Sequence, residues 1–286
     1  METLRIAIQS KGRLAEDSLR LIKDCGIQFD TESRVLKERA YNFPLEFLFV
    51  RDDDIPGYVH DGIADIGIVG RNEYDEQNLP LKVVKDLGFA KCRLSVAVPV
   101  DFEYQGLSSL EGKRIATSYP GILGRVLAEH GVHAKFVNVS GSVEVTPAIG
   151  IADCICDLVS TGTTLKANGL REAECVYRTS AVLIARQDMG NEEKQAILRR
   201  LMLRINAVQK AQGYKYIMFN LPEKELEKVR KIVPGMKSPT VTHLLEQGWV
   251  SVQTVVQEDH FWDVVEQLKN LGAEGILVTA IEKMTE

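Results

Sequence analysis

Residues 153–165 read Asp-Cys-Ile-Cys-Asp-Leu-Val-Ser-Thr-Gly-Thr-Thr-Leu, and this stretch contains one β/α transition. Its first half is a short apolar run of the kind that forms a buried strand, which we expect at Asp153–Val159. Small hydroxyl residues and Gly162 follow, as is typical of a turn. A helix is predicted to begin near Leu165–Ala167. The stretch therefore predicts an α/β fold, with this turn at the carboxyl end of a strand.

The turn at Ser160–Thr164 is a candidate anion site. Backbone N–H groups and hydroxyls at the start of a helix bind anions, and Gly162 permits close approach of a ligand. The turn lacks the Gly-Lys-Ser/Thr of a nucleoside-triphosphate loop, so we expect it to hold a single phosphate monoester. Asp157, at the end of the strand, is placed to accept hydrogen bonds from vicinal ribose hydroxyls. An ordinary Ser/Thr-rich turn that caps a helix is the alternative, and these residues alone leave it open.

The alternation of strands and helices extends outward from this stretch and predicts parallel sheets covered by helices. It restarts near residue 93, which predicts two lobes, residues 1–92 with 181–212, and residues 93–180. A long strand, Ala173–Ala185, is expected to cross back to the first lobe, and two crossing strands would leave a cleft between the lobes. The other predicted strands are Leu4–Gln9, Leu45–Val50, Asp65–Val69, Arg93–Pro99, Lys113–Thr117 and Lys135–Val139; the predicted helices are Leu14–Cys25, one that begins at Asp52–Pro56, Ile122–His130, Val143–Ile149 and one that Asn191 caps and that ends near Gln212.

The last 74 residues, 213–286, differ from the rest in their pattern. Their pattern predicts the order strand, helix, strand, strand, helix, strand, which is the order of a ferredoxin-like domain. About 70 residues suffice for a separate small domain. The predicted elements are Tyr214–Asn220, Glu223–Ile232, Thr240–Leu245, Trp249–Val256, Asp259–Leu271 and Gly275–Ile281.

Composition excludes several classes of protein. The 286 residues are 45% hydrophobic and carry a net charge of −5, which argues against disorder and against a nucleic-acid binder with a broad basic face. No apolar run approaches the roughly 20 residues that a bilayer requires, so we expect no membrane span. The chain starts directly with a predicted strand, so we expect no export leader. Five cysteines without metal-type spacing favour reduced thiols and a cytoplasmic location.

Two groups of cations follow predicted strands at the carboxyl edge of the first sheet. Lys11 and Arg13 flank Gly12 immediately after the first strand, and Arg51 directly follows the second. Such cations suit a polyphosphate, whose charge neutral donors cannot neutralise. Solvated charges in ordinary strand–helix loops are an equally good interpretation.

Other runs are weaker signals. Gly67 and Gly70 leave two positions of a predicted strand without side chains. Close packing against a neighbouring element explains these glycines somewhat better than the approach of a ligand. Glu144 is a candidate second carboxylate facing the turn after Asp157. His130 and His133 have no third ligand nearby in sequence, so we predict no protein metal site there. The chain has no Gly-x-Ser-x-Gly and no Rossmann glycine triplet, and this removes support for hydrolase and dehydrogenase functions.

One spaced pattern carries a specific resemblance. It runs Glu144-x5-Gly150-x-Ala152-x2-Ile155-x-Asp157-Leu158-x2-Thr161-Gly162-x-Thr164-Leu165. This pattern closely resembles the signature of ATP phosphoribosyltransferase, the first enzyme of histidine biosynthesis, in its long form. The likeness covers essentially the whole chain, including 9–14, 51–57, 67–70, 114–120, 141–145 and 235–240.

The resemblance implies two periplasmic-binding-protein-like lobes and a C-terminal ACT-like regulatory domain. It implies transfer of the phosphoribosyl group of PRPP (phosphoribosyl pyrophosphate) to N1 of the adenine of ATP, with release of pyrophosphate and with Mg²⁺ as cofactor. Histidine would be a feedback inhibitor, accompanied by a shift of the homo-oligomer from dimer to hexamer. Ala273, in the loop at residues 272–275, is a candidate for the effector site.

The resemblance also assigns roles to individual residues. Lys11 and Arg51 would approach the pyrophosphate, Arg13 the ATP phosphates, and Tyr119 the adenine. Some family members have Pro-Lys where this chain has Asp52-Asp53, so any pyrophosphate contact from that lysine is absent here. We expect no general base, because the ring nitrogen is already a nucleophile and pyrophosphate already a good leaving group. The residues assigned to PRPP are Glu144, Asp157, Ser160, Thr161, Gly162, Thr163 and Thr164.

Two other functions compete with this interpretation. A bilobal α/β fold can capture a small ligand without chemistry, but paired cations and a phosphate turn exceed what an amino-acid receptor needs. A purine-salvage phosphoribosyltransferase also joins an acid to Thr-Gly, but it usually has two adjacent acids before that loop, whereas here Cys156 precedes Asp157. Pyrophosphate release from PRPP on addition of ATP, rather than of a free base, distinguishes the three.

Overall fold

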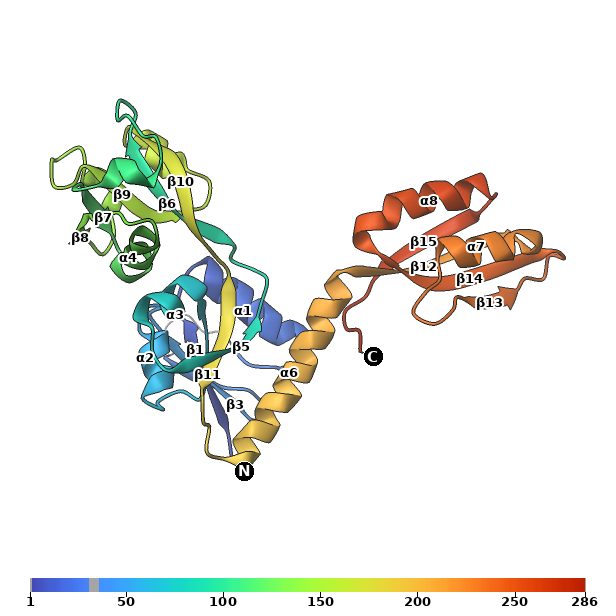
Figure 1. Ribbon diagram of the computed structural model, residues 1–286. Coiled ribbons are helices and arrows are strands. Elements are labelled where there is room, and N and C mark those ends of the chain that lie inside the picture. The colour runs from blue at the N-terminus through green and yellow to red at the C-terminus, as the bar shows by residue number, and fades with distance from the viewer. Residues whose placement is uncertain (1, 31–35, 286) are drawn as a thin grey trace. The chain divides into compact units, whose positions relative to one another are not determined.

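The structure is a computed structural model that describes residues 2–30 and 36–285. The chain forms two compact units. The first contains residues 27–197 and the segment that ends at Arg20; the second contains Leu21–Gly26 and the chain from Leu198 onward. The first unit holds two sheets and the second holds one (Figure 1). The boundaries predicted at residues 92, 180 and 212 stay a prediction.

The first sheet has six strands in the order β2-β3-β1-β4-β11-β5. The central strand β1 pairs in parallel with β3 and β4, and its residues Ile6, Ala7 and Ile8 are fully buried. Such continuous burial is expected of a parallel strand covered on both faces. The strands are β1 (Leu4–Gln9), β2 (Lys37–Arg39), β3 (Leu45–Val50), β4 (Ile66–Gly70), β5 (Leu81–Asp86) and β11 (Ala181–Arg186).

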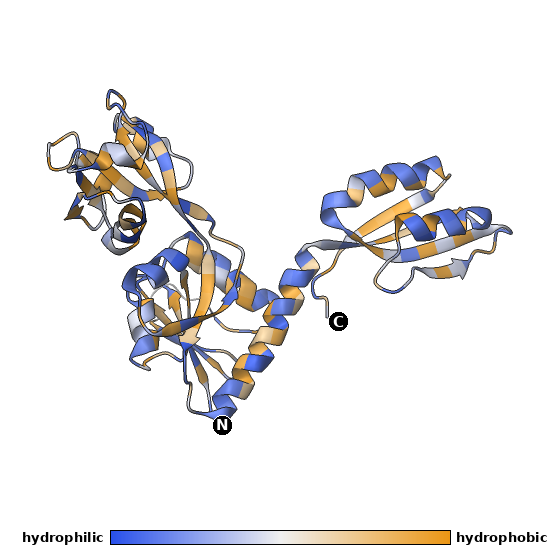
Figure 2. Cartoon of the chain, viewed as in Figure 1, coloured by the Kyte–Doolittle hydropathy of each residue, from blue (hydrophilic) through white to orange (hydrophobic). Residues whose placement is uncertain are grey.

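The second sheet has five strands in the order β10-β6-β9-β7-β8. β7 pairs in parallel with β8 and β9, while β6 runs antiparallel to β9 and β10. Figure 2 shows the strands of both sheets mainly in orange, the hydrophobic end of the scale. The strands are β6 (Cys92–Pro99), β7 (Arg114–Thr117), β8 (Lys135–Asn138), β9 (Cys154–Val159) and β10 (Leu170–Thr179).

Two expectations about these sheets were wrong. The predicted single strand Ala173–Ala185 is two strands in different sheets, β10 and β11, separated at Ser180. The sheets are also mixed rather than purely parallel, because β11 runs antiparallel to β4 and β5. β6 and β11 each enter their sheet from the other sheet, so no βα crossover makes them parallel to their neighbours, and the consecutive strands β2 and β3 are antiparallel as well.

The helices of the first unit follow the predicted pattern with small shifts. Helix α5 begins two residues earlier than expected, and the predicted helix Val143–Ile149 is only one 3₁₀ turn. Helix α3 was not predicted. The helices are α1 (Arg13–Asp24, which reaches into the second unit), α2 (Ile55–His60), α3 (Arg71–Gln77), α4 (Pro120–Glu129) and α5 (Thr163–Ala167); the 3₁₀ turns are η1 (Leu107–Leu110) and η2 (Val143–Val145).

Gly67 allows α2 to pack closely on β4. A Cβ atom built on Gly67 would lie 2.5 Å from Cγ2 of Ile55 and 3.1 Å from Cγ2 of Val59. Ile55 and Val59 are fully buried on α2, and the approach to Ile55 is closer than real Cβ atoms come to a neighbour. Close packing, rather than a ligand, therefore explains this glycine.

We expect Gly67→Ala to lower the free energy of unfolding by about 2–3 kcal/mol, because the added methyl group forces α2 away from β4. Denaturant unfolding measures the change. Gly57→Ala is the matched control, since a Cβ there meets nothing within 4 Å. Equal stability of the two variants would contradict the packing argument.

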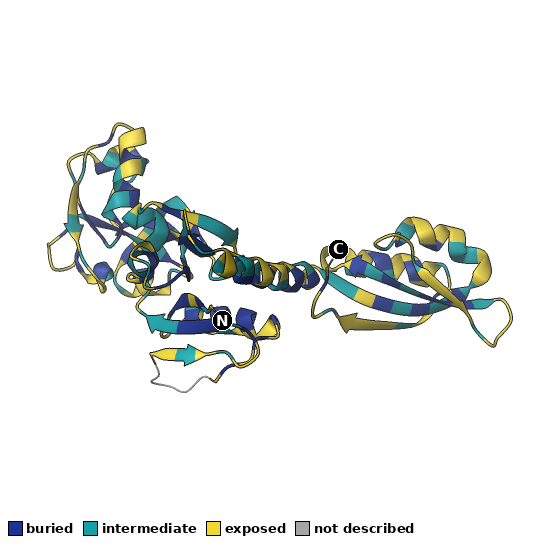
Figure 3. Ribbon diagram, turned by 90° about the horizontal axis from the view of Figure 1, so that it is seen from below, coloured by how far each residue is buried: buried dark blue, intermediate teal, exposed yellow. Residues whose placement is uncertain are grey.

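Helix α6 (Glu192–Gln212) begins in the first unit and continues into the second. Oδ1 of Asn191 accepts hydrogen bonds from the backbone N–H groups of Glu193 (2.9 Å) and Lys194 (3.3 Å), which confirms the predicted cap. Buried and exposed positions alternate along the helix (Figure 3). The predicted stripe is confirmed, because Ile197, Leu201, Ile205 and Val208 are all buried.

The C-terminal sheet of the second unit confirms the predicted ferredoxin-like order. Its strands lie in the order β13-β14-β12-β15 and all neighbours are antiparallel. Phe219, Val252 and Leu268 are fully buried in its core. The elements are β12 (Tyr214–Pro222), η3 (Glu223–Glu225), α7 (Leu226–Ile232), β13 (Thr240–His243), β14 (Trp249–Gln257), η4 (Glu258–His260), α8 (Phe261–Asn270) and β15 (Glu274–Ala280).

None of the helices in the described residues combines the length and apolar character that crossing a membrane requires. The five cysteines are free thiols, three of them buried: Cys25, Cys154 and Cys156.

Candidate active site

The turn between β9 and α5 has the form that the sequence predicts. Gly162 occupies the left-handed region at φ +77° and immediately precedes the helix. The hydroxyls of Ser160, Thr161, Thr163 and Thr164 belong to exposed residues, and the Oγ1 atoms of Thr161 and Thr163 lie 3.1 Å apart. The N–H groups of a helix's first turn have no partner within the helix. The turn thus presents hydroxyl and amide donors together, which is what a phosphate monoester requires.

Arg93 supports this turn, a role that the sequence did not reveal. Its Nη1 donates to the carbonyl oxygen of Ser160 (3.1 Å), while Nε and Nη2 bind the carboxylate of Glu172 (2.5 and 2.6 Å). Ser95 also donates to Glu172 (2.8 Å). The paired strands β6 and β10 therefore hold the first residue of the turn. The only sequence signal was an arginine at the start of a strand, which is too common to single out.

Asp157 is a half-buried carboxyl on β9, three residues before the turn. Burial raises its pKa to about 6; the backbone N–H of Leu158, which donates to Oδ1 at 2.8 Å, lowers the pKa, and the charge of Glu144 raises it further. Glu144 lies on η2, near enough for its charge to act on the Asp157 carboxyl, and its part in the site stays a prediction. At neutral pH Asp157 is largely ionised but poorly solvated, so a ligand that donates hydrogen bonds to it is favoured.

Lys11 and Arg13 lie at the carboxyl end of β1. Both side chains belong to exposed residues, and Gly12 between them has φ +94°, which a residue with a side chain adopts only with strain. Within the described residues, neither cation forms an ion pair. Arg13 is the first residue of α1. Both cations are therefore available to an anionic ligand.

Arg51 follows β3 and lies at the same edge of the sheet, since the backbone N–H of Ser10 donates to the carbonyl oxygen of Val50 (2.8 Å). In contrast to Lys11, Arg51 has an internal partner. Its Nε and Nη2 bind the carboxylate of Asp53 at 3.1 and 2.9 Å. The acidic residue that departs from the family pattern thus partly neutralises the cation expected to meet pyrophosphate.

We expect Asp53→Asn to tighten pyrophosphate binding by about threefold, because exposed ion pairs such as Arg51–Asp53 contribute about 0.2–1 kcal/mol. Competitive inhibition by pyrophosphate measures the effect. Asp54→Asn is the control, since it removes an equal charge from an exposed neighbour whose carboxylate does not bind Arg51. Equal effects of the two changes would show that overall charge, not the pair, matters.

Tyr119 is buried at the start of α4, with 8% of its surface exposed. Its hydroxyl donates to Oε1 of Glu73 (2.8 Å) and accepts from Nδ2 of Asn72 (3.2 Å). Burial raises its pKa, as does the charge of Glu73. Both hydrogen bonds of the Tyr119 hydroxyl are therefore made to helix α3. A role of the Tyr119 ring beside adenine stays a prediction.

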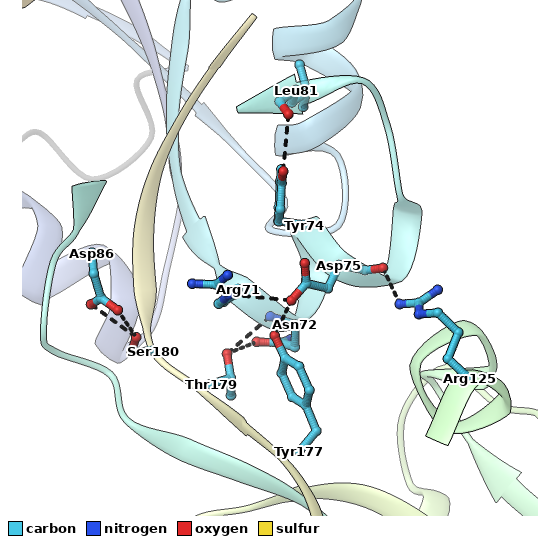
Figure 4. A network of polar contacts seen from close by, with 10 residues as sticks. All are labelled: Arg71, Asn72, Tyr74, Asp75, Leu81, Asp86, Arg125, Tyr177, Thr179 and Ser180. Carbon is cyan, nitrogen blue, oxygen red and sulfur yellow. Dashed lines mark hydrogen bonds and ion pairs between the residues drawn. The ribbon is translucent and has the colours of Figure 1, made fainter. Parts of the chain in front are cut away.

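Helix α3 carries a network that joins the two sheets of the first unit (Figure 4). Asn72 exchanges hydrogen bonds with Thr179: its backbone N–H donates to the threonine Oγ1 (3.1 Å), which donates to Oδ1 of Asn72 (2.8 Å). The hydroxyl of Tyr177 donates to the carboxylate of Asp75, and Nη2 of Arg125 donates to the carbonyl oxygen of Asp75 (2.6 Å). These residues were missed because α3 itself was missed.

The remaining candidate, Ala273, lies in the ferredoxin-like domain. It is 5% exposed within the core, and its backbone N–H donates to the carbonyl oxygen of Leu268 (3.0 Å). Its part in effector binding stays a prediction. In the described residues, no group of three or more His, Cys, Asp or Glu side chains is arranged to hold a metal ion.

Among solved structures, the chain is similar to an ATP phosphoribosyl transferase (HisG:HisZ) complex from Thermotoga maritima. The two chains are 28% identical with a TM-score of 0.60, over 71% of this chain and 99% of that one. A histidine kinase sensor domain with similarity to periplasmic binding proteins shares the fold at 14% identity and a TM-score of 0.50, over 73% of this chain and 91% of that one. The two sheets thus form the predicted bilobal fold.

Sequence comparison covers nearly the whole chain. The curated ATP phosphoribosyltransferase of Cytophaga hutchinsonii is 54% identical over 99% of both chains, and that of Parabacteroides distasonis is 52% identical over 98% of this chain and 99% of that one. The family described as "ATP phosphoribosyltransferase" matches residues 51–207, and the one described as "HisG, C-terminal domain" matches residues 211–283. The chain belongs to the ATP phosphoribosyltransferase family.

Proposed function

We propose that the enzyme transfers the phosphoribosyl group of PRPP to N1 of the adenine of ATP and releases pyrophosphate, as the first step of histidine biosynthesis. The observation that carries the proposal is the exposed hydroxyl turn that directly follows a half-buried acid, Asp157. In this proposal the 5′-phosphate lies in the turn, with contacts from residues 160–164. Asp157 accepts hydrogen bonds from the ribose hydroxyls, and Glu144 lies beside it.

The cations at the edge of the first sheet would serve the other end of PRPP. Lys11 and Arg51 neutralise the departing pyrophosphate, and Arg13 binds the phosphates of ATP. Charge develops on the leaving group during displacement at the anomeric carbon, so fixed cations accelerate the reaction more than they strengthen binding. No protein acid or base is needed, because the adenine nitrogen is the nucleophile.

Mg²⁺ is the proposed cofactor. Glu144 lies close enough for its charge to act on the Asp157 carboxyl, and a pair of carboxylates fits an ion that keeps several waters and binds mainly to substrate phosphates. When bound, the ion would reduce the negative charge of the pyrophosphate. Lys11, Arg13 and Arg51 supply the remaining positive charge from the protein.

The assay that tests the proposal measures pyrophosphate release from PRPP and Mg²⁺ with ATP, and in parallel with free adenine or hypoxanthine. We expect pyrophosphate release from PRPP when ATP is added, and none when a free base is added. Release with a free base would indicate a purine-salvage reaction instead. PRPP binding without turnover in any mixture would indicate a binding module.

We further propose that the ferredoxin-like domain is an ACT-like regulatory domain that binds histidine as feedback inhibitor, and that the cytoplasmic enzyme is a homo-oligomer that shifts between dimer and hexamer. The Thermotoga maritima relative is described as a complex of two proteins, whereas this chain has its own C-terminal domain. Histidine would shift the assembly by binding one oligomer more tightly than the other.

We expect deletion of residues from 213 onward to abolish inhibition by histidine while PRPP- and ATP-dependent turnover persists, because the catalytic residues proposed above all precede this point. Steady-state assays with and without histidine measure the effect. Inhibition that persists in a folded truncated chain would place the effector site elsewhere.

A further inference from the structure

Helix α3 (Arg71–Gln77), which follows β4 of the first sheet, supplies a cap for a helix of the other sheet's lobe. Oε1 of Glu76 accepts a hydrogen bond from the backbone N–H of Gly121 (2.6 Å), and Oε2 accepts one from that of Ile122 (2.8 Å). These N–H groups belong to the first turn of α4 (Pro120–Glu129). One carboxylate therefore satisfies two of the amides that a helix N-terminus leaves unpaired.

Helix α4 has no cap of its own. Its N-cap residue, Tyr119, makes no side-chain hydrogen bond to the helix, and its first turn contains no acidic residue. The negative charge at the positive end of the α4 dipole comes from Glu76, 45 residues away in the sequence. The cap is thus a link between lobes and not a local feature of α4.

Gly121 fits this contact because it has no side chain. A Cβ atom at Gly121 would lie 2.9 Å from Oε1 and 3.2 Å from the backbone oxygen of Glu76. One turn further along α4, a Cβ atom at Gly124 would lie 3.4 Å from a ring carbon of Phe136 in its own lobe, an ordinary contact. The two glycines of α4 therefore differ in whether a methyl group would separate the lobes.

The same interface lies close to the proposed PRPP site. Tyr119, two residues before Gly121, donates to Glu73 on α3. Burial raises the tyrosine pKa most, followed by the charge of Glu73, and Asp157 lies near enough for its charge to raise the pKa further. A shift of α4 relative to α3 would therefore move the lobe that carries Asp157. The cations Lys11 and Arg51 stay with the other lobe.

We propose that Glu76 is a positioning residue: its bonds to Gly121 and Ile122 hold the lobe with the phosphate turn in register with the lobe that carries Lys11 and Arg51. The inference rests on the proposed function, in which PRPP contacts both lobes. The 5′-phosphate and ribose bind to one lobe, and the cations of the other lobe act mainly on the departing pyrophosphate, so loss of the cap leaves PRPP binding almost intact. Displacement needs both lobes in register, so loss of the cap slows turnover.

The test compares Glu76→Gln and Gly121→Ala with the control Gly124→Ala. Glutamine offers one acceptor oxygen to two N–H groups, and alanine at 121 displaces the carboxylate. We expect kcat to fall about 10- to 100-fold in both test variants, because misplacement by about 1 Å has effects of this size. We expect the Kd of PRPP, by calorimetry, to change less than about threefold in all three variants.

Hydrogen exchange provides a readout that does not depend on activity. We expect the amides of Gly121 and Ile122 to exchange at least about tenfold faster in Glu76→Gln than in the wild type, since an uncapped first-turn amide is open to water. Gly124→Ala should retain wild-type protection there and wild-type kcat. Both glycine variants gain helix propensity, so a difference between them reports the lobe contact.

Equal kcat in Gly121→Ala and Gly124→Ala, or unchanged amide exchange in Glu76→Gln, would overturn the inference. A loss of PRPP affinity that matches the loss of kcat would also overturn it, because Glu76 would then support binding instead of register. Absence of PRPP-dependent turnover in the wild-type enzyme is a different result, which contradicts the proposed function and not the cap.

Discussion

Replacement of Asp157 by alanine is expected to lower kcat/KM for PRPP about 1000-fold, the largest effect of any single change at the site. In the proposed complex this carboxylate accepts both ribose hydroxyls, and each hydrogen bond to a charged group contributes about 1.5–3 kcal/mol. Steady-state kinetics at varied PRPP and saturating ATP measures the loss. Unchanged PRPP kinetics would refute the assignment.

The pKa of Asp157 predicts how this activity depends on pH. Because burial raises the pKa to about 6, kcat/KM for PRPP is expected to fall as the pH decreases through about 6, when the acceptor becomes protonated. An ordinary aspartate would place this loss near pH 4. A wild-type profile that stays flat down to pH 5 would contradict the role of the ionised carboxyl.

The ionised carboxyl of Asp157 is expected to lower the free energy of unfolding. A carboxyl whose pKa is higher in the folded than in the unfolded protein favours folding when protonated, and this contribution disappears as the pH rises through about 6. We therefore expect Asp157→Asn to raise the free energy of unfolding by about 2–3 kcal/mol at pH 8 and by less than about 1 kcal/mol at pH 4.

Asp153→Asn is the matched control for this effect. Asp153 directly precedes the same strand, but hydrogen bonds from Arg114 lower its pKa, so its replacement should reduce stability at pH 8. Denaturant unfolding of both variants at the two pH values gives the comparison. If the free energy of unfolding changed with the same sign in the two variants, burial would not be what governs the pKa of Asp157.

Replacement of Lys11 by alanine is the second large effect. We expect kcat to fall about 100-fold, because removal of one group that stabilises developing charge typically costs this much or more. Lys11 is exposed and forms no ion pair within the described residues, so its replacement should change stability by less than about 0.5 kcal/mol. Turnover at saturating PRPP and ATP, with parallel unfolding curves, separates the two quantities.

The control for Lys11 is Arg20→Ala, which removes an equal charge from the exposed surface of α1, where Arg20 pairs with Asp17. We expect this variant to retain the wild-type rate. The reverse reaction, from phosphoribosyl-ATP and pyrophosphate, passes through the same transition state, so Lys11→Ala should slow it by a similar factor. A full forward rate in Lys11→Ala would remove this residue from the mechanism.

Most local structure could be predicted from the sequence. The strand Leu45–Val50 has the predicted bounds, and Asn191 caps α6 as expected, because apolar spacing and capping depend on residues a few positions apart. The short helix α3 was missed, since its seven residues include neither an amphipathic stripe nor a capping side chain. Its side chains Asn72, Glu73 and Glu76 form hydrogen bonds with the other lobe, which no local pattern reveals.

The sequence by itself determined the α/β alternation, the ferredoxin-like order of the last domain and the hydroxyl turn after Asp157, because each depends on residue types at short, regular spacings. Only the tertiary structure decided that the expected crossing strand breaks into β10 and β11 at Ser180, and which distant groups meet, such as Arg93 with the Ser160 carbonyl and Glu76 with the amides of α4. These contacts join residues 45 to 67 positions apart, and their partners are set by how strands and helices pack rather than by any local pattern.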